Sequence, residues 1–174
     1  MTTDKHQRFM AMPIQRPEDV PTATPLSWQA EKLANAGERL FANLLLPADY
    51  PHPVERGTAD DALTQLALGE AIRRTIENHR PGDIHQALTL GATWSEVATA
   101  LDISPDEARD LLRDWADGQH HLYAGDQERG EARPLGFSPT RHAEVTALCE
   151  RGDDKRDDRK EVSWPSTTPR SGTS

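Results

Sequence analysis

The sequence predicts an all-α protein, a small helical bundle with two closely spaced helices at its centre and disordered termini. Apolar residues recur at helical spacing in several separate stretches, and residue patterns typical of helix caps precede them. Only 5% of the 174 residues are aromatic, so Leu, Ala, Ile and Val must fill the core, as they do in small bundles. A hydrophobic content of 35% suffices for one core of ordinary size, and we expect one domain over residues 27–150.

The first predicted helix follows a proline-containing lead. Residues 1–26 carry prolines at a near-regular spacing of four and little that could be buried, which predicts an extended, disordered segment. Ser27 is a suitable N-cap for a helix that runs to Leu46, and this helix is the segment that we expect to pair with a second copy if the protein is a homodimer. Its apolar side consists of Leu33, Ala36, Leu40 and Leu44, widened by Trp28 and Phe41.

A second helix is predicted from Thr58 to about His79. The Thr58 hydroxyl can cap it, and Leu68, Ile72 and Ile76 form one apolar row. Leu63 and Leu66 point toward another side, so we expect this helix to be contacted from two directions and to be central in the bundle. Pro81-Gly82 should break the chain, and a short helix should start at Asp83 and stop at Gly91.

The segment Thr93–Trp115 gives the strongest local signal in the sequence. Thr93 and Glu96 form a capping-box pattern, and Ser104 with Glu107 forms another, with a proline at the first position of the second helix. Asp102 stands at the turn, where a left-handed backbone conformation is usual, and Asp adopts it at little cost. The apolar face shared by the two helices consists of Trp94, Val97, Ala98, Leu101, Ile103, Ala108, Leu111, Leu112 and Trp115.

The C-terminal part is predicted to hold one more helix. Residues 122–136 are polar and contain glycine, as expected for a loop, and Ser138-Pro139 should start a short helix that carries Val145 and Leu148. Cys149 is the only cysteine, which excludes an intramolecular disulfide, and its apolar neighbours predict burial. Residues 151–174 are first rich in mixed charge and then in Ser, Thr and Pro, and we expect a disordered tail.

Residues 84–115 resemble the tri-helical, helix-turn-helix domains of bacterial regulators and of the promoter-reading region of sigma factors. The wider stretch around GATWSEVATAL is also similar to uncharacterised small actinobacterial proteins with a GATWxEVxxAL core. The resemblance implies a recognition helix that begins at Pro105 and faces a DNA groove. The side chains that it would direct toward DNA are Ser104, Asp106, Arg109, Asp110 and Arg113.

The charge of this region opposes DNA binding. Residues 81–122 contain eight acidic and two basic side chains, and DNA affinity depends mainly on neutralising phosphates. If DNA is bound, the phosphate contacts must come from arginines elsewhere, either Arg73, Arg74 and Arg80 or Arg129, Arg133 and Arg141. We therefore carry two hypotheses: a non-enzymatic DNA-binding or transcription-associated protein, and an acidic interaction module for a basic protein partner. The residues assigned to DNA contact are Ser104, Arg109, Arg113, Arg73 and Arg74.

Other function classes find little support in the sequence. A formal net charge of −9 argues against non-specific binding to nucleic acid or anionic lipid over the whole surface. We expect a cytoplasmic protein, because no run of residues is long and apolar enough to cross a membrane and no export signal is recognisable. We predict no metal or cofactor, since the histidines lack a regular ligand spacing, and no catalytic residues, since no phosphate loop or nucleophile elbow is present.

Overall fold

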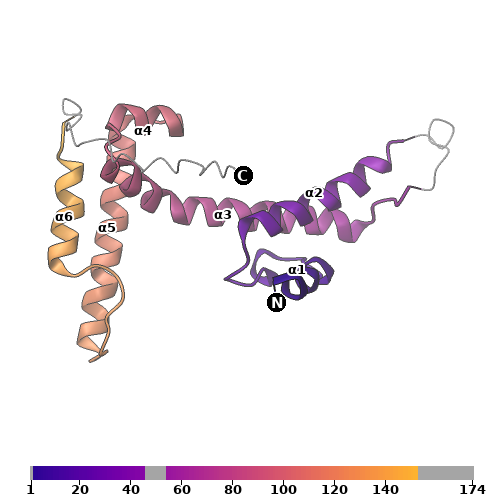
Figure 1. The fold of residues 1–174 in the computed structure, drawn as a ribbon, viewed down its shortest axis with the longest axis horizontal. Helices are drawn as coiled ribbons and strands as arrows, with labels where there is room; N and C mark the ends of the chain where they lie inside the picture. Colours follow the sequence, from indigo (N-terminus) through magenta and orange to yellow (C-terminus); the bar gives the residue numbers. More distant parts are fainter. Residues whose placement is uncertain (1, 46–53, 153–174) are drawn as a thin grey trace, which may run out of the picture. The chain divides into compact units, whose positions relative to one another are not determined.

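The computed structural model describes residues 2–45 and 54–152, and all regular structure within these ranges is helical (Figure 1). This confirms the predicted all-α class. No helix in the described ranges is long and apolar enough to span a bilayer. The elements are α1 (Thr2–Ala11), a 3-10 turn η1 (Pro17–Asp19), α2 (Leu26–Ala42), α3 (Ala59–Thr89), α4 (Trp94–Leu101), α5 (Pro105–Glu128) and α6 (Pro139–Cys149).

The chain divides into two compact units, here called the N-terminal unit (Met1–Arg80) and the C-terminal unit (Pro81–Ser174). This division differs from the single domain that we expected over residues 27–150. The reason is that buried apolar side chains gather in two separate clusters, one in each unit. The boundary between the units falls inside α3.

Helix α1 corrects the prediction of a disordered lead over residues 1–26. Phe9 and Ile14 are buried at 4% and 0% exposure in a cluster with Ala67 and Leu68 of α3. The prolines misled the prediction because α1 ends before the first of them, and Pro17 and Pro25 then lie at the starts of η1 and α2. Proline costs little at a helix start, where its missing N–H would have had no partner.

A buried lysine holds the end of α1 against α2. The Lys32 ammonium donates hydrogen bonds to the carbonyl oxygens of Met10 at 2.6 Å, Met12 at 2.7 Å and Phe9 at 3.3 Å. Carbonyls at a helix C-terminus lack partners within the helix and carry the negative end of its dipole, so a cation is favourable there. Burial lowers the pKa of the lysine, in opposition to this favourable contact.

An ion pair joins helix α2 to the start of α3. The Arg39 guanidinium contacts Asp61 Oδ1 at 2.5 Å through Nη2 and at 2.9 Å through Nε. Asp61 also accepts a hydrogen bond from the backbone N–H of Thr58 at 2.8 Å, and the Thr58 hydroxyl accepts one from the Asp61 N–H at 3.4 Å, so Thr58 caps α3 as predicted. The backbone at residue 57 passes close to the backbone of α2. Only glycine fits there, because a Cβ atom would lie 2.7 Å from the backbone nitrogen of Leu40.

We expect Asp61→Asn to flatten the acid side of the stability profile. The hydrogen bonds from Arg39 and Thr58 lower the pKa of Asp61 from 3.8 to about 2. Because the folded pKa lies below the unfolded one, the ionised carboxylate stabilises the fold above pH 3.8, and this contribution disappears as the pH falls toward 2. Urea titrations between pH 2 and 5 should show a loss of about 1–2 kcal/mol in the wild type that is absent from the variant. An equal slope in both proteins would contradict this role of Asp61.

Helix α3 continues through Pro81, where a break was expected, and that expectation was wrong. A proline inside a helix removes one backbone hydrogen bond and costs about 3 kcal/mol. The residues beyond it offset this cost, since Ile84 and Leu88 are buried at 3% and 4% exposure in the core of the C-terminal unit. The helix then ends at Thr89, and Gly91 follows with a positive φ of 102°.

The expectation that α3 is contacted from two directions was also wrong for its second apolar row. Leu63 and Leu66 are 45% and 72% exposed. The other row is buried only in part, since Leu68 is fully buried but Ile76 is 46% exposed. Phe41 and Leu44, expected on the buried stripe of the preceding helix, are likewise exposed at 63% and 75%. Pairing of this helix with a second copy stays a prediction.

In the C-terminal unit α4 and α6 both pack on α5, and the end of α3 completes the core. Val145 is fully buried and Cys149 is 3% exposed, which confirms the predicted burial of the lone cysteine. The core residues are Ile84, Leu88, Trp94, Val97, Ala108, Leu112, Ala116, Val145 and Cys149.

Helix α5 extends to Glu128, well into the segment predicted as a loop from residue 122. The following segment folds back along it, and Figure 1 shows α6 beside α5. The N–H of Phe137 donates to the carbonyl of Gln119 at 3.0 Å, and the N–H of Leu135 donates to the buried Asp126 carboxylate at 2.8 Å. These two hydrogen bonds join the C-terminal part of α5 to the segment that precedes α6. Of the predicted tail over residues 151–174, only Arg151 and Gly152 belong to the described residues.

Candidate nucleic-acid or protein interface

Helices α4 and α5 form a turn with the backbone geometry that the sequence predicts. Thr93 and Glu96 make a reciprocal capping box at the start of α4, and Ser104 and Glu107 make another at the start of α5. Asp102 is the only non-glycine residue with a positive φ among those described, with φ 54° and ψ 44°. The predicted left-handed turn between two capped helices is therefore confirmed.

Ser104 is occupied by its role as a cap. Its hydroxyl donates to Glu107 Oε2 at 2.8 Å and accepts from the Glu107 backbone N–H at 3.2 Å. Backbone and side-chain hydrogen bonds from Ser104 also lower the pKa of Glu107, which keeps that side chain ionised. A contact from Ser104 to a DNA phosphate would have to replace these bonds, and Glu107 would stay beside the phosphate.

Arg109 is largely withdrawn from the surface. Its side chain is 21% exposed, it forms an ion pair with Asp106 at 3.0 Å, and its guanidinium lies over the Trp94 ring at 5.1 Å from the centroid. Cation–π contacts of this kind stabilise by about 0.5–2 kcal/mol, more when the cation is desolvated. The arginine that was assigned to DNA contact thus also joins α5 to the first residue of α4.

Arg113, one turn later on α5, is more accessible. Its side chain is 44% exposed and forms an ion pair with Asp110 at 2.6 Å. Exposed pairs of this kind contribute at most about 1 kcal/mol and open readily, so the pair itself is no strong obstacle to another partner.

Arg73 and Arg74 belong to the N-terminal unit and are tied into a network of carboxylates. Arg73 contacts Glu70 at 2.8 Å and Glu77 at 2.5 Å, and Arg74 contacts Glu70 at 2.7 Å and Glu18 at 2.8 Å. The two guanidinium groups lower the pKa of Glu70 to about 2. All four arginines that were assigned to DNA contact are therefore ion-paired, and only Arg109 and Arg113 are carried by α5.

The exposed side of α5 near its start is dominated by carboxylates. Asp106 and Asp110 have side chains that are 92% and 67% exposed, and Glu107 and Asp114 are also exposed. Over residues 81–152 the sequence contains 13 acidic and six basic side chains, a difference of −7. We call Asp106, Asp110 and Asp114 the acidic face of α5.

A pair of histidines lies between α5 and α6. The rings of His120 and His142 stack with centroids 4.7 Å apart, and His142 Nε2 lies 2.6 Å from an Asp117 oxygen. The described residues contain no group of three or more side chains that could hold a metal ion. We interpret the pair as part of the packing between α5 and α6, since His120 Nδ1 also lies 3.1 Å from the Phe137 carbonyl.

Sequence reasoning missed two features of this unit. The contact between Arg109 and Trp94 joins residues on different helices, and the apolar spacing that placed Trp94 in the core did not reveal its cationic neighbour. A pocket lined by His85, Arg141 and Arg151 was missed as well, because these residues come together only when α6 packs beside the end of α3.

Neither a protein-family model nor a curated protein nor a solved structure matches this chain. The function of the two capped helices must therefore be argued from their own geometry and charge.

Proposed function

We propose that this chain is a non-enzymatic helix-turn-helix protein whose acidic face on α5 binds a basic protein partner. The observation that supports the proposal is the charge on that face: its carboxylates are exposed, while Arg109 and Arg113 are each paired with one of them. A lysine- or arginine-rich surface is attracted to such a face, and this attraction steers association.

DNA binding through the same helix is the second candidate. Two capped helices about a left-handed turn are what a helix-turn-helix reader requires, and Arg113 is exposed enough to reach a base edge. Opening the pair with Asp110 would cost at most about 1 kcal/mol. The stronger objection is that Asp106, Glu107 and Asp114 would then face phosphates, whose neutralisation supplies most DNA affinity.

The two candidates are separated by a charge-neutralised variant. We expect the wild type to bind a defined Lys/Arg decapeptide with a Kd that rises with salt, and the Asp106→Asn, Asp110→Asn, Asp114→Asn variant to bind it at least about tenfold more weakly. Isothermal titration calorimetry at two salt concentrations is the measurement. The matched control replaces Glu128, Glu131 and Glu150 by Gln, which removes the same charge from exposed positions of the same unit.

A parallel titration uses mixed-sequence duplex DNA at low salt. Equal loss of peptide binding in both neutralised variants would show that net charge alone is responsible, and the proposal would fail. The second candidate, DNA binding through α5, would be supported instead if the protein binds duplex DNA but not the peptide. In that case Arg113→Gln should abolish DNA binding and Arg133→Gln should preserve it.

A further inference from the structure

In the N-terminal unit, α1 and the residues that follow it cover one side of α2 and one side of α3. On α2, the Lys32 ammonium contacts the carbonyls at the end of α1. On α3, the Thr64 hydroxyl donates to the carbonyl of Ile14 at 3.0 Å, and Ala67 and Leu68 are buried in the same cluster as Ile14. Each of the two helices therefore has a side that faces α1 and a side that faces away from it.

The sides that face away from α1 carry large apolar residues. Successive residues of a helix are about 100° apart, so a separation of two or of nine residues leads to nearly the opposite side. Phe41 lies nine residues after Lys32, Leu66 lies two residues after Thr64, and Ile76 lies nine residues after Ala67. We call the open face the set of residues Phe41, Leu44, Leu66 and Ile76, which are between 46% and 75% exposed.

The open face is one surface made by two helices. A Cβ atom at Gly37 of α2 would lie 3.4 Å from Gln65 Nε2 of α3, so the two helices touch here. Phe41 follows Gly37 by about one turn on the same side of α2, and Leu66 adjoins Gln65 on α3. Figure 1 shows α2 beside α3 in this part of the unit. The apolar residues of both helices are thus available to a single partner.

The charge of the N-terminal unit allows the partner to be a second copy. Arg73 lies two turns after Leu66 on the same side of α3, and Glu70 and Glu77 of its own helix neutralise it. Residues 1–80 contain 11 acidic and nine basic side chains, a difference of −2, so most of the formal charge of −9 lies in the rest of the chain. Two N-terminal units can therefore approach each other with little like-charge repulsion.

The open face also has a suitable size for a dimer. A large apolar side chain that is exposed to this extent presents on the order of 100 Å² to water. Two open faces together then remove about 800 Å² of apolar surface from water, and their flanking residues bring the total toward the roughly 1,200–2,000 Å² of a stable interface. Ala62, Gln65 and Gly69 are such flanking residues on α3.

We propose that two copies of this chain associate through their open faces, so that Phe41, Leu44, Leu66 and Ile76 of one copy pack against the same residues of the other. A surface that pairs with itself in this way forms a closed dimer with twofold symmetry. Helices α2 and α3 of the two copies then form a common core, with α1 of each copy on the outside. The association uses other side chains than the acidic face of α5, so it does not depend on the proposed function.

Sedimentation velocity of the full chain over about 1–300 µM is the first test. We expect the mass to double from 19.3 kDa as the concentration rises, with a dimer Kd on the order of 10 µM. A wild type that stays monomeric at about 300 µM would overturn the proposal. The open face would then be covered by another part of the same chain, such as residues 46–53 or the C-terminal unit.

Two glycine substitutions locate the interface without disturbing the monomer. Gly69 lies three residues after Leu66 on the open face, and a Cβ atom there meets nothing within 4 Å. Gly118 on α5 is equally free of neighbours and provides the matched control. Glutamate favours a helix more than glycine does, so both variants should fold, as circular dichroism can verify.

Gly69→Glu should weaken the dimer at least about tenfold, because it places one carboxylate from each copy in an apolar interface. Gly118→Glu should leave the dimer Kd unchanged. If both variants weaken the dimer equally, net charge is responsible and the proposal is wrong. If neither weakens it, the copies pair through another surface and the proposal is equally wrong.

Discussion

Replacing Trp94 by alanine is expected to lower the free energy of unfolding of the C-terminal unit by about 3–5 kcal/mol. Trp94 is 1% exposed and joins three helices: its ring belongs to the core, its Nε1–H donates to the carbonyl of Leu148 on α6, and the Arg109 guanidinium of α5 lies over its face. Removal of the ring leaves a large cavity and abolishes both polar contacts at once. Urea unfolding followed by circular dichroism gives the measurement.

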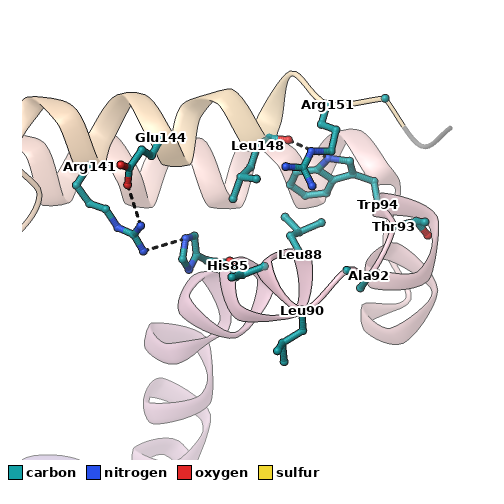
Figure 2. A pocket seen from close by; sticks show the side chains of 13 residues that line it. His85, Leu88, Leu90, Ala92, Thr93, Trp94, Arg141, Glu144, Leu148 and Arg151 are labelled. Carbon is teal, nitrogen blue, oxygen red and sulfur yellow. Dashed lines mark hydrogen bonds and ion pairs between the residues drawn. The ribbon is translucent and has the colours of Figure 1, made fainter. Parts of the chain in front are cut away.

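A second variant separates the packing from the polar contact. Trp94→Phe keeps much of the aromatic volume but lacks the N–H donor (Figure 2), and because the Leu148 carbonyl still accepts from the backbone N–H of Arg151, we expect a loss of only about 0.5–1.5 kcal/mol. Leu135→Ala serves as the control, because Leu135 is 66% exposed and should change stability by less than about 0.5 kcal/mol. Similar stabilities of Trp94→Ala and the control would show that Trp94 does not anchor the unit.

Lys32→Met is expected to destabilise the N-terminal unit by about 2–4 kcal/mol and to release α1. The substitution keeps the aliphatic stem but leaves the carbonyls of Phe9, Met10 and Met12 without their buried donor. Loss of one partner of a buried polar contact has a large effect because the other partner cannot return to water. Hydrogen exchange at residues 4–12 should therefore accelerate more than exchange in α5.

The control for the Lys32→Met variant is the same substitution at a lysine of α1 itself. Lys5 is exposed on α1 and makes no hydrogen bond or ion pair with the described residues, so Lys5→Met should leave both stability and exchange within error of the wild type. Exchange in α1 that is equally fast in the wild type and in Lys32→Met would mean that the lysine does not hold the helix in place.

The features that the sequence predicted correctly depend on neighbours along the chain. The caps at Thr93 and Ser104 and the left-handed Asp102 follow from side chains that reach backbone groups within three residues. The start of α3 after Thr58 and of α6 after Ser138 were found by the same rules. Such interactions join residues that are close in the sequence, so a pattern of four or five residues is enough to predict them.

The features that were mispredicted depend on distant partners. Phe9 and Ile14 are buried by residues of α3 more than fifty positions later in the sequence. Lys32 donates hydrogen bonds to carbonyls some twenty positions earlier. Pro81 is a helix breaker by local rules, yet burial of Ile84 and Leu88 keeps α3 intact. Tertiary packing overrides local propensity where burial of distant residues stabilises the structure by more free energy than the unfavourable local preference costs.

The candidate site shows the same division. The positions of Arg109 and Arg113 on α5 were predicted from helical periodicity, and their pairing with Asp106 and Asp110 three residues earlier could be read from spacing. The stacking of Arg109 on Trp94 and the pocket beside Arg151 arise only from the packing of separate helices. Whether the acidic face or the arginines meet a partner is a question for the binding experiments above.

The turn at residues 102–104 has a consequence for the order in which the C-terminal unit folds. Helices α4 and α5 are each started by their own cap and lie next to each other in the sequence, so bringing them together closes a very short loop and loses little chain entropy. Helix α6 must instead return along α5 through the segment after Glu128, a slower search because its contacts are less local. We expect the α4–α5 hairpin to form in the folding transition state and α6 to dock afterwards, so that substitutions at Ala108 should slow folding while substitutions at Val145 should mainly accelerate unfolding.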